Sequence, residues 1–216
     1  MERIVIIGSG PQARIIPDII AARNDMDLLG FVDVSDERRF LMEDSATFPV
    51  YGKEIFPNGL KAIFDKFSIF IANDSAIREG LIAQAKDADL PFVNIIHPSA
   101  IISPRSRLGI GIMISPGVII GPGAVIGDHC IINSAATVDH DSTLSDNVIL
   151  APGVHLAGHV KVESGTSIGI GACCLPGVKI GANCIIGAGS VITKAIPENS
   201  VAAGVPAKVL RSREQT

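Results

Sequence analysis

Residues 118–150 read VIIGPGAVIGDHCIINSAATVDHDSTLSDNVIL, and an aliphatic residue recurs in them at every sixth position. The same register covers sixteen hexads without an insertion, and Cys174 is its one non-aliphatic member. The full register is Ile102, Leu108, Ile114, Ile120, Ile126, Ile132, Val138, Leu144, Leu150, Leu156, Val162, Ile168, Cys174, Ile180, Ile186 and Ile192. A helix repeats its faces every 3.6 residues and a strand every two, so neither element gives a period of six. Short parallel strands that meet at tight corners do, and the period therefore predicts a parallel β-helix.

Small residues accompany this register. The residue after each aliphatic position is often Gly or Ala, and the residue four places on is small or branched in many hexads. Gly suits the tight corners that such a coil requires. The repeat thus indicates which positions build the solenoid, and departures from it identify candidate functional residues.

The composition fits this architecture and excludes some functions. The chain of 216 residues is 47% apolar but only 4% aromatic and has no Trp, as a narrow interior of Ile, Val, Leu and Ala requires. A net charge of -4 gives no reason to expect a nucleic-acid partner, and no Lys/Arg run suggests an anionic membrane surface. We see no signal peptide and no apolar stretch of about 20 residues that could cross a bilayer. We therefore expect a cytoplasmic protein without membrane insertion.

The cysteine pattern supports the same compartment. The four cysteines, Cys130, Cys173, Cys174 and Cys184, show no metal-type spacing, and three of them fall where the repeat calls for small residues. We interpret them as reduced structural thiols.

Residues 1–97 show a different pattern, in which short apolar runs alternate with helical periodicity. Strands are predicted at 3–7, 28–32, 69–71 and 92–96, and helices at 11–24 and 76–88, the latter with Ile77, Leu81 and Ile82 inward. Residues 34–68 indicate no definite element. The alternation predicts a small parallel α/β domain, Rossmann-like, over residues 1–97. A β-helix domain with a C-terminal tail follows over 98–216.

Two features of the first domain suggest a ligand. Gly8, Ser9 and Gly10 lie between a predicted strand and a predicted helix, where backbone N–H groups favour a phosphate. Asp33, at the end of the second strand, could accept a hydrogen bond from a ribose hydroxyl. The third glycine of the dinucleotide-binding pattern is absent. A tight turn without a ligand explains the same residues, so both interpretations stay open.

The departure from the repeat that bears on chemistry is residues 133–141, NSAATVDHD. Val138 points inward, so His140, two places on, projects outside the coil. Asp139 and Asp141 flank it, and a neighbouring carboxylate strengthens an imidazole as a base. This arrangement suits a general base for an amine or hydroxyl nucleophile, although a solvated surface histidine fits the same spacing.

The whole chain resembles the bacterial sugar acetyltransferases of the hexapeptide type, the group of sialic acid O-acetyltransferases and nucleotide-amino-sugar N-acetyltransferases. The matching stretches are 6–10 (IIGSG), 30–33 (GFVD), 96–100 (IHPSA), 132–141 (INSAATVDHD) and 204–208 (GVPAK). The resemblance implies a left-handed β-helix with three hexads per coil, hence about five coils. It also implies a homotrimer in which acetyl-CoA, the co-substrate, lies between neighbouring β-helices. From the hexad phases of the histidines, given below, we expect no metal.

The resemblance further implies roles for individual residues. His140 becomes the base, Asp141 its orienting carboxylate and Asn133 a polar group near the acceptor sugar, with Gly8, Ser9, Gly10 and Asp33 binding the substrate nucleotide. The backbone N–H of Gly158, one coil after His140, is the candidate oxyanion donor. The implied coenzyme-binding residues are Gly158, Ala188, Gly189, Gly204, Pro206, Ala207 and Lys208, with Arg211 as a further phosphate partner.

Some residues depart from the family pattern. Related proteins usually carry Gly-His where this chain has Pro11 and Gln12, and an imidazole where it has Ile149. Some hexapeptide proteins bind zinc through three histidines, but His140, His155 and His159 fall at different phases of the hexad. We therefore expect that these three do not share one edge of the chain, and read His129 and His97 as turn and domain-junction residues.

The leading prediction is an acetyl-CoA-dependent N-acetyltransferase acting on the amine of a nucleotide-linked amino-deoxysugar for a bacterial surface glycan. O-acetylation of a sugar such as sialic acid would use the same base and the same thioester. A trimeric scaffold without catalysis, since the repeat alone stabilises the fold, and a metal-dependent lyase are alternatives of other classes.

Overall fold

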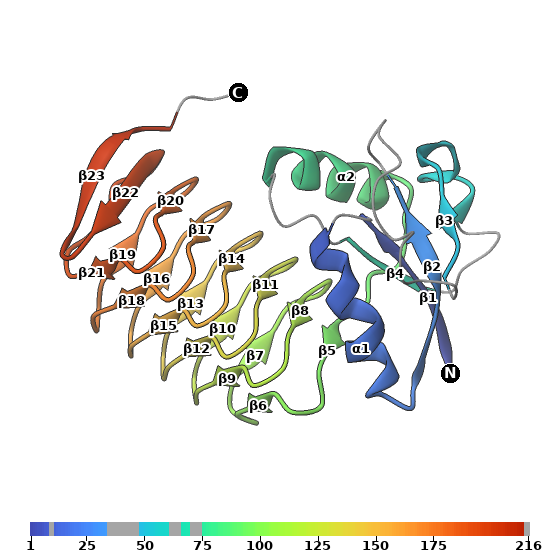
Figure 1. Ribbon diagram of the computed structural model, residues 1–216, viewed down its shortest axis with the longest axis horizontal. Helices are drawn as coiled ribbons and strands as arrows, with labels where there is room; N and C mark the ends of the chain where they lie inside the picture. The colour runs from blue at the N-terminus through green and yellow to red at the C-terminus, as the bar shows by residue number, and fades with distance from the viewer. Residues whose placement is uncertain (9–10, 34–47, 61–65, 70–74, 214–216) are drawn as a thin grey trace. The chain divides into compact units, whose positions relative to one another are not determined.

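The computed structural model describes residues 1–8, 11–33, 48–60, 66–69 and 75–213 (Figure 1). Ser9, Gly10 and most of the indefinite segment 34–68 therefore lie outside the described residues. Internal contacts divide the chain into two compact units, Met1–Pro98 and Ser99–Thr216.

The first unit is built on a parallel sheet, as the alternation of strands and helices predicts. Its strands are β1 Glu2–Ile7, β2 Met26–Val32, β3 Val50–Tyr51 and β4 Lys66–Ile69, in the order β3-β2-β1-β4. The helices are the 3₁₀ turns η1 Pro11–Arg14 and η2 Lys53–Ile55 and the α-helices α1 Ile15–Ala21 and α2 Ser75–Asp87, and β5 is Ile95–Ile96. All three strand pairs are parallel, as expected when helices connect neighbouring strands.

The core of this unit explains one error of the sequence-based prediction. Leu81 and Ile82 of α2 pack with Val5, Ile7 and Val32 of the sheet, but Ile77 is 53% exposed. The buried stripe of α2 includes Arg78 and Ala85 as well, and Ile77 lies about a quarter turn away from its centre. The prediction that Ile77 points inward was wrong. Within the described residues, no helix combines the length and the apolar character that a bilayer crossing requires.

The second unit is a parallel β-helix with three faces of two-residue strands, which stack as ladders in Figure 1. The first face holds β6 Ile101–Ile102, β9 Ile119–Ile120, β12 Thr137–Val138, β15 His155–Leu156, β18 Cys173–Cys174 and β21 Val191–Ile192. The second holds β7 Arg107–Leu108, β10 Val125–Ile126, β13 Thr143–Leu144, β16 Lys161–Val162 and β19 Lys179–Ile180. The third holds β8 Met113–Ile114, β11 Ile131–Ile132, β14 Ile149–Leu150, β17 Ser167–Ile168 and β20 Ile185–Ile186, followed by β22 Ser200–Gly204, which pairs antiparallel with β23 Ala207–Ser212.

The predicted register is confirmed. Strands pair with those eighteen residues away, as Thr137 with His155, so one coil takes three hexads. The aliphatic residue of each strand from Ile114 to Ile192 is buried, and so is Cys174, at 3% exposure. The β-helix is consistent with the left-handed form that the resemblance implies. The prediction of about five coils was too low, because two of the three faces carry more than five strands and β22 continues the third face beyond the last hexad.

The corners share one backbone conformation that the hexads dictate. Every sixth residue from 111 to 189 has a positive φ, between 55° and 74°. Gly adopts this left-handed conformation without strain, and Asn and Asp tolerate it better than most residues. Six of the fourteen positions are not glycine: His129, Ala135, Asp141, Asn147, His159 and Asn183. His129 is thus a turn residue, as predicted, and the corners place specific side chains at fixed points outside the coil.

Candidate active site

The corner after β12 holds Asp139, His140 and Asp141 outside the coil. Asp141 occupies the left-handed position, with a φ of 57°. The Asp139 carboxylate accepts the backbone N–H of His140 at 2.7 Å, which fixes the start of the corner. The side chains of His140 and Asp141 are 48% and 55% exposed, so both are open to a ligand.

His140 and Asp141 form a pair with a defined tautomer. Nδ1 of His140 lies 2.9 Å from Oδ2 of Asp141. Because an ionised carboxylate only accepts, Nδ1 donates and Nε2 is left with its lone pair when the ring is neutral. A base oriented in this way by a carboxylate can take a proton from a nucleophile.

The same contact sets the charge of both groups. The hydrogen bond to Asp141 raises the pKa of His140 above its ordinary value, and the charges of Asp139 and Asp141 add to this effect. The hydrogen bond from His140 lowers the pKa of Asp141, with contributions from the charges of His159, His140 and Arg105. Asp141 therefore stays ionised while His140 titrates, as an orienting carboxylate must.

Gly158 lies directly beneath the His140 ring. A Cβ on Gly158 would overlap Nε2 and Cε1 of His140, so only glycine leaves room for the ring here. Gly158 is buried, and no described group accepts its backbone N–H. This N–H is therefore available to an oxygen of a reacting group, as an oxyanion donor must be.

His159 lies at the same corner as His140, which the phases of the hexad did not lead us to expect. The ring centroids are 5.0 Å apart and the rings are nearly perpendicular, at 88°. Nε2 of His159 is 4.0 Å from Oδ2 of Asp141. The hexad phase of a residue locates it within one coil only. His140 and His159 lie two and three places after their register aliphatics, yet both belong to corners that follow the first face, in successive coils, and they meet there. The prediction that the three histidines are separate was wrong for this pair.

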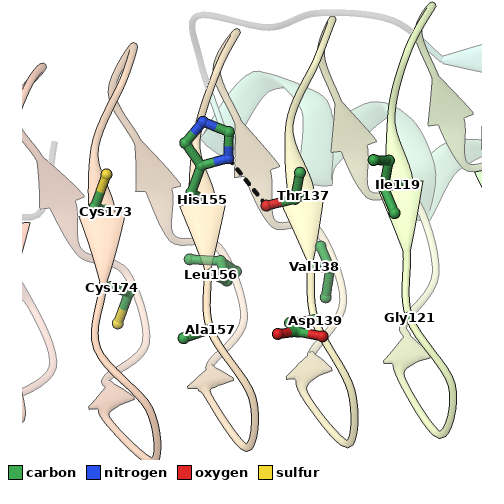
Figure 2. Close-up of a pocket in the computed structure, with 10 residues that line it drawn as sticks. All are labelled: Ile119, Gly121, Thr137, Val138, Asp139, His155, Leu156, Ala157, Cys173 and Cys174. Carbon is green, nitrogen blue, oxygen red and sulfur yellow. Dashed lines mark hydrogen bonds between the residues drawn. The ribbon is translucent and has the colours of Figure 1, made fainter.

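His155, by contrast, lies on the face of the strands. Its Nδ1 is 3.0 Å from Oγ1 of Thr137 on the neighbouring strand (Figure 2). Among the described residues His155 belongs to no cluster that could hold a metal ion, which speaks against zinc held jointly by His140, His155 and His159. The described residues that could reach one ion together are instead His140, Asp141 and His159, whose ligand atoms lie within 4.8 Å of one another.

A groove of about 350 Å³ runs along this face beside the His140 corner. Ile119, Thr137, His155 and Cys173 form a row across β9, β12, β15 and β18, and Gly121, Asp139 and Ala157 border them where the corner begins (Figure 2). The groove is lined by both apolar and polar side chains, which suits an elongated ligand that carries both kinds of group.

Other predicted site residues lie on a different corner of the coil. Asn133 follows β11 and is buried, and its Nδ2 donates to the carbonyl of Leu150 at 2.8 Å. Ala188 and Gly189 lie on the same kind of corner, after β20, and are exposed. Within one chain, a strand of the first face separates this corner from that of His140.

The remaining predicted residues lie in a hairpin and in the first unit. Gly204, Pro206, Ala207 and Lys208 surround the turn between β22 and β23, and Gly204, Pro206 and Lys208 are exposed.

In the first unit, the N–H of Gly8 donates to the carbonyl of Val32 at the carboxyl edge of the parallel sheet. Asp33 directly follows β2 at the same edge. Asp33 is buried. This edge is where parallel sheets bind ligands.

The four cysteines carry no disulfide, and three are buried in the coil. Burial raises the pKa of the Cys174 thiol to about 12, which makes it unreactive. Cys130 and Cys184 are buried as well and fill small-residue slots of the repeat, while Cys174 takes an aliphatic position of the register.

The chain resembles proteins of known activity along its whole length. Perosamine N-acetyltransferase from Caulobacter crescentus, solved as a histidine-to-asparagine mutant with CoA and GDP-perosamine, is 36% identical over 98% of both chains, with a TM-score of 0.89. The acetyltransferase domain of PglB from Neisseria gonorrhoeae FA1090 is 30% identical over 97% of this chain and 100% of that chain, with a TM-score of 0.87. The chain belongs to the acetyl-CoA-dependent, hexapeptide-repeat sugar acetyltransferases.

Narrower comparisons agree with this family. Residues 159–194 match the family model "Bacterial transferase hexapeptide (six repeats)". A galactoside O-acetyltransferase from Lactococcus lactis is 52% identical over 52 residues, 24% of this chain and 25% of that protein. The match thus spans only about a quarter of this curated relative. A further structure of the PglB domain contains acetyl coenzyme A, the co-substrate of the family.

Proposed function

We propose that this protein transfers the acetyl group of acetyl-CoA to the amine of a nucleotide-linked amino-deoxysugar, with His140 as the general base, in the synthesis of a bacterial surface glycan. One observation carries the proposal. The imidazole of His140 is oriented by Asp141 and lies directly over Gly158, whose N–H has no acceptor among the described residues. A base and an oxyanion donor side by side are what acyl transfer requires.

The chemistry follows from these atoms. The neutral amine attacks the thioester carbon and a C–N bond forms, while Nε2 of His140 takes a proton from the nitrogen. The carbonyl oxygen becomes an oxyanion, which the N–H of Gly158 stabilises. The C–S bond then breaks, and the coenzyme leaves as a thiolate that takes the proton from His140. Asp141 stabilises the imidazolium between the two proton transfers, as its effect on the pKa of His140 implies.

An amine acceptor has broader support than a hydroxyl. The perosamine N-acetyltransferase structure, with bound GDP-perosamine, matches nearly the whole chain. The galactoside O-acetyltransferase is more identical but matches only a quarter of it. O-acetylation of a sugar, sialic acid included, is the second candidate, since the same base and thioester would serve it.

The first unit supplies the features expected of a nucleotide site. Gly8 and Asp33 follow adjacent parallel strands, and Gly8 has a φ of 115°. Backbone N–H groups near Gly8 would meet the phosphates and Asp33 the ribose. Ser9 and Gly10 are proposed for the same site on the basis of the sequence, because both lie outside the described residues.

The coenzyme-binding residues support a homotrimer. Ala188 and Gly189 lie on a different corner from His140, so the coenzyme could contact both corners if they came from neighbouring copies. Ile101 and Ile119 on the first face are 65% and 44% exposed, which provides apolar surface for such an interface. The hairpin residues Gly204, Pro206, Ala207 and Lys208 would hold the coenzyme, with Lys208 and Arg211 near its phosphates.

The test is release of free thiol from acetyl-CoA by the wild-type protein and by His140→Ala. The acceptors are nucleotide-linked 4-amino and 3-amino sugars, sialic acid and a galactoside. We expect release with an amino sugar that is lost in His140→Ala, and acetylation of the nitrogen confirmed by mass spectrometry of the product.

Two other results would change the assignment. Release only with sialic acid or the galactoside would establish O-acetylation. No thiol release with any acceptor, together with no acetyl-CoA binding by calorimetry, would overturn the proposal in favour of a scaffold without catalysis.

A further inference from the structure

In each corner that follows the first face we number the residues from the end of the strand, so that Asp139, His140 and Asp141 occupy the first, second and third positions after β12. Residues at the same position in successive coils form a column. In the second position of the corner, His140 is followed one coil later by Gly158. In the third position, Gly123, Asp141 and His159 succeed one another eighteen residues apart, all with positive φ. Neighbouring strands lie about 4.8 Å apart, so the third-position side chains are close enough to touch.

Three contacts join His159 to the catalytic pair. The backbone N–H of His159 donates to the carbonyl of His140 at 3.0 Å, which fixes one coil to the next. The imidazole of His159 meets that of His140 edge to face, with centroids 5.0 Å apart. Its Nε2 lies 4.0 Å from Oδ2 of Asp141, the same oxygen that accepts Nδ1–H of His140. The carboxylate thus bonds to one imidazole and lies within ion-pair reach of a second.

We propose that His159 is a positioning residue for the base: its ring confines the imidazole of His140 over Gly158, and its Nε2 lies within ion-pair reach of the Asp141 carboxylate, 4.0 Å from Oδ2. The inference rests on the proposed function of His140. The Asp141 side chain is more than half exposed, and among the described residues its one hydrogen-bond partner is His140, so Asp141 alone would leave the pair free to turn toward solvent. His159 opposes that rotation from the side of the following coil.

The charges around the pair agree with this role. Asp139 and Asp141 favour the protonated form of His140. Besides the hydrogen bond from His140, the charges of His159 and Arg105 lower the pKa of the Asp141 carboxyl, so both charges help to keep the partner of His140 ionised.

The space around the corner agrees with this arrangement. Gly123, the third-position residue of the preceding coil, has no side chain, and a Cβ there would overlap Oδ1 of Asp141. The carboxylate therefore has backbone on one side and the imidazole of His159 on the other.

Three substitutions separate the two contacts. His159→Ala removes both, His159→Phe keeps the ring against His140 without an N–H, and His159→Gln keeps an N–H donor without the ring. Lys161→Ala is the matched control, because Lys161 is an exposed residue of the next strand and lies outside the site. We expect kcat to fall about tenfold in His159→Ala, with KM for acetyl-CoA within about twofold, because positioning acts on the reacting geometry. The Phe and Gln variants should each recover part of the loss, and Lys161→Ala should match the wild type.

A second measurement needs no substrate. The Nδ1–H proton of His140, assigned by NMR with His140→Asn, should exchange with water faster in His159→Ala than in the wild type, because the unconfined imidazole leaves the Asp141 carboxylate more often. His159→Phe, which keeps a ring against His140, should restore part of the slow exchange. A merely structural histidine would lower the melting temperature without changing this exchange rate.

The outcomes separate this inference from the proposed function. If the wild type acetylates no acceptor, the proposed function fails, and the exchange measurement still tests the contact between the two histidines. If the wild type is active but His159→Ala keeps its kcat within about twofold and the exchange rates coincide, the positioning role is overturned and the function of His140 stands.

Discussion

Two corners of the same coil, the one after β12 and the one after β11, have the same backbone but use their polar residues in opposite ways. The corner after β12 exposes His140 and Asp141 at its second and third positions. The corner after β11 has Ser134 and Ala135 at these two positions, and its Asn133, at the first position, is buried and bonds to the Leu150 carbonyl. A polar side chain is therefore structural or chemical according to its position in the corner. Four substitutions test this comparison.

The largest effect is expected from His140→Ala. Loss of a positioned general base lowers kcat/KM by about 10²–10⁴-fold. The side chain is about half exposed, so the melting temperature should stay close to that of the wild type. Steady-state kinetics and thermal unfolding followed by circular dichroism measure the two. A fully active variant would remove the chemical difference between the two corners.

Gly158→Ala is expected to have the next largest effect, about 10²-fold on kcat. The added methyl would occupy the space of the His140 ring and displace it from the N–H of Gly158. Gly80→Ala in α2 is the control for the substitution type, because a Cβ there meets nothing within 4 Å. Equal kinetics for the two variants would show that His140 does not act over Gly158.

Asp141→Asn should reduce kcat about tenfold and move its pH dependence. Asn also tolerates the left-handed backbone, so the corner is kept. Nε2 must be neutral to accept a proton, so activity is lost as the pH falls through the pKa of His140, which Asp141 raises. Without the carboxylate that pKa falls, and the acid limb of kcat/KM should shift to lower pH. A profile recorded over about pH 5 to 9 checks the shift, and an unmoved limb would contradict the role of Asp141.

The smallest effect on activity is expected from Asn133→Ala. The variant loses one buried hydrogen bond, so its free energy of unfolding should fall by about 1 kcal/mol while kcat changes about twofold or less. Denaturant unfolding and kinetics of the same preparation measure both. A large rise in KM for the acceptor sugar would instead support the acceptor role that the family resemblance implies for Asn133.

Much of the solenoid could be predicted from the sequence because its repeat is local. Each hexad specifies its own inward aliphatic, its small corner residue and its place eighteen residues from its neighbours. The extent of the coil was less predictable. β22 continues the third face as Ser200–Gly204 without a register aliphatic, and only pairing with β20 reveals it.

The first unit shows the same limit in a helix. Residues 75–87 form α2 close to the predicted range, but the helical period alone does not say which edge of an apolar stripe meets the sheet. The contacts with β1 and β2 decide it, and they leave Ile77 in solvent.

The sequence by itself determined the β-helix, its register, the outward position of His140 and the carboxylates beside it, because all of these follow from spacing along one or two hexads. Tertiary structure alone decided that His140 lies over Gly158, that His159 packs against the ring of His140 near the Asp141 carboxylate, and that Asn133 turns into the coil. These relations join residues of neighbouring coils or depend on side-chain direction. The reason is physical: a period assigns each residue a phase, but the contacts that hold a base in place form between layers, where backbone conformation and side-chain volume decide which groups meet.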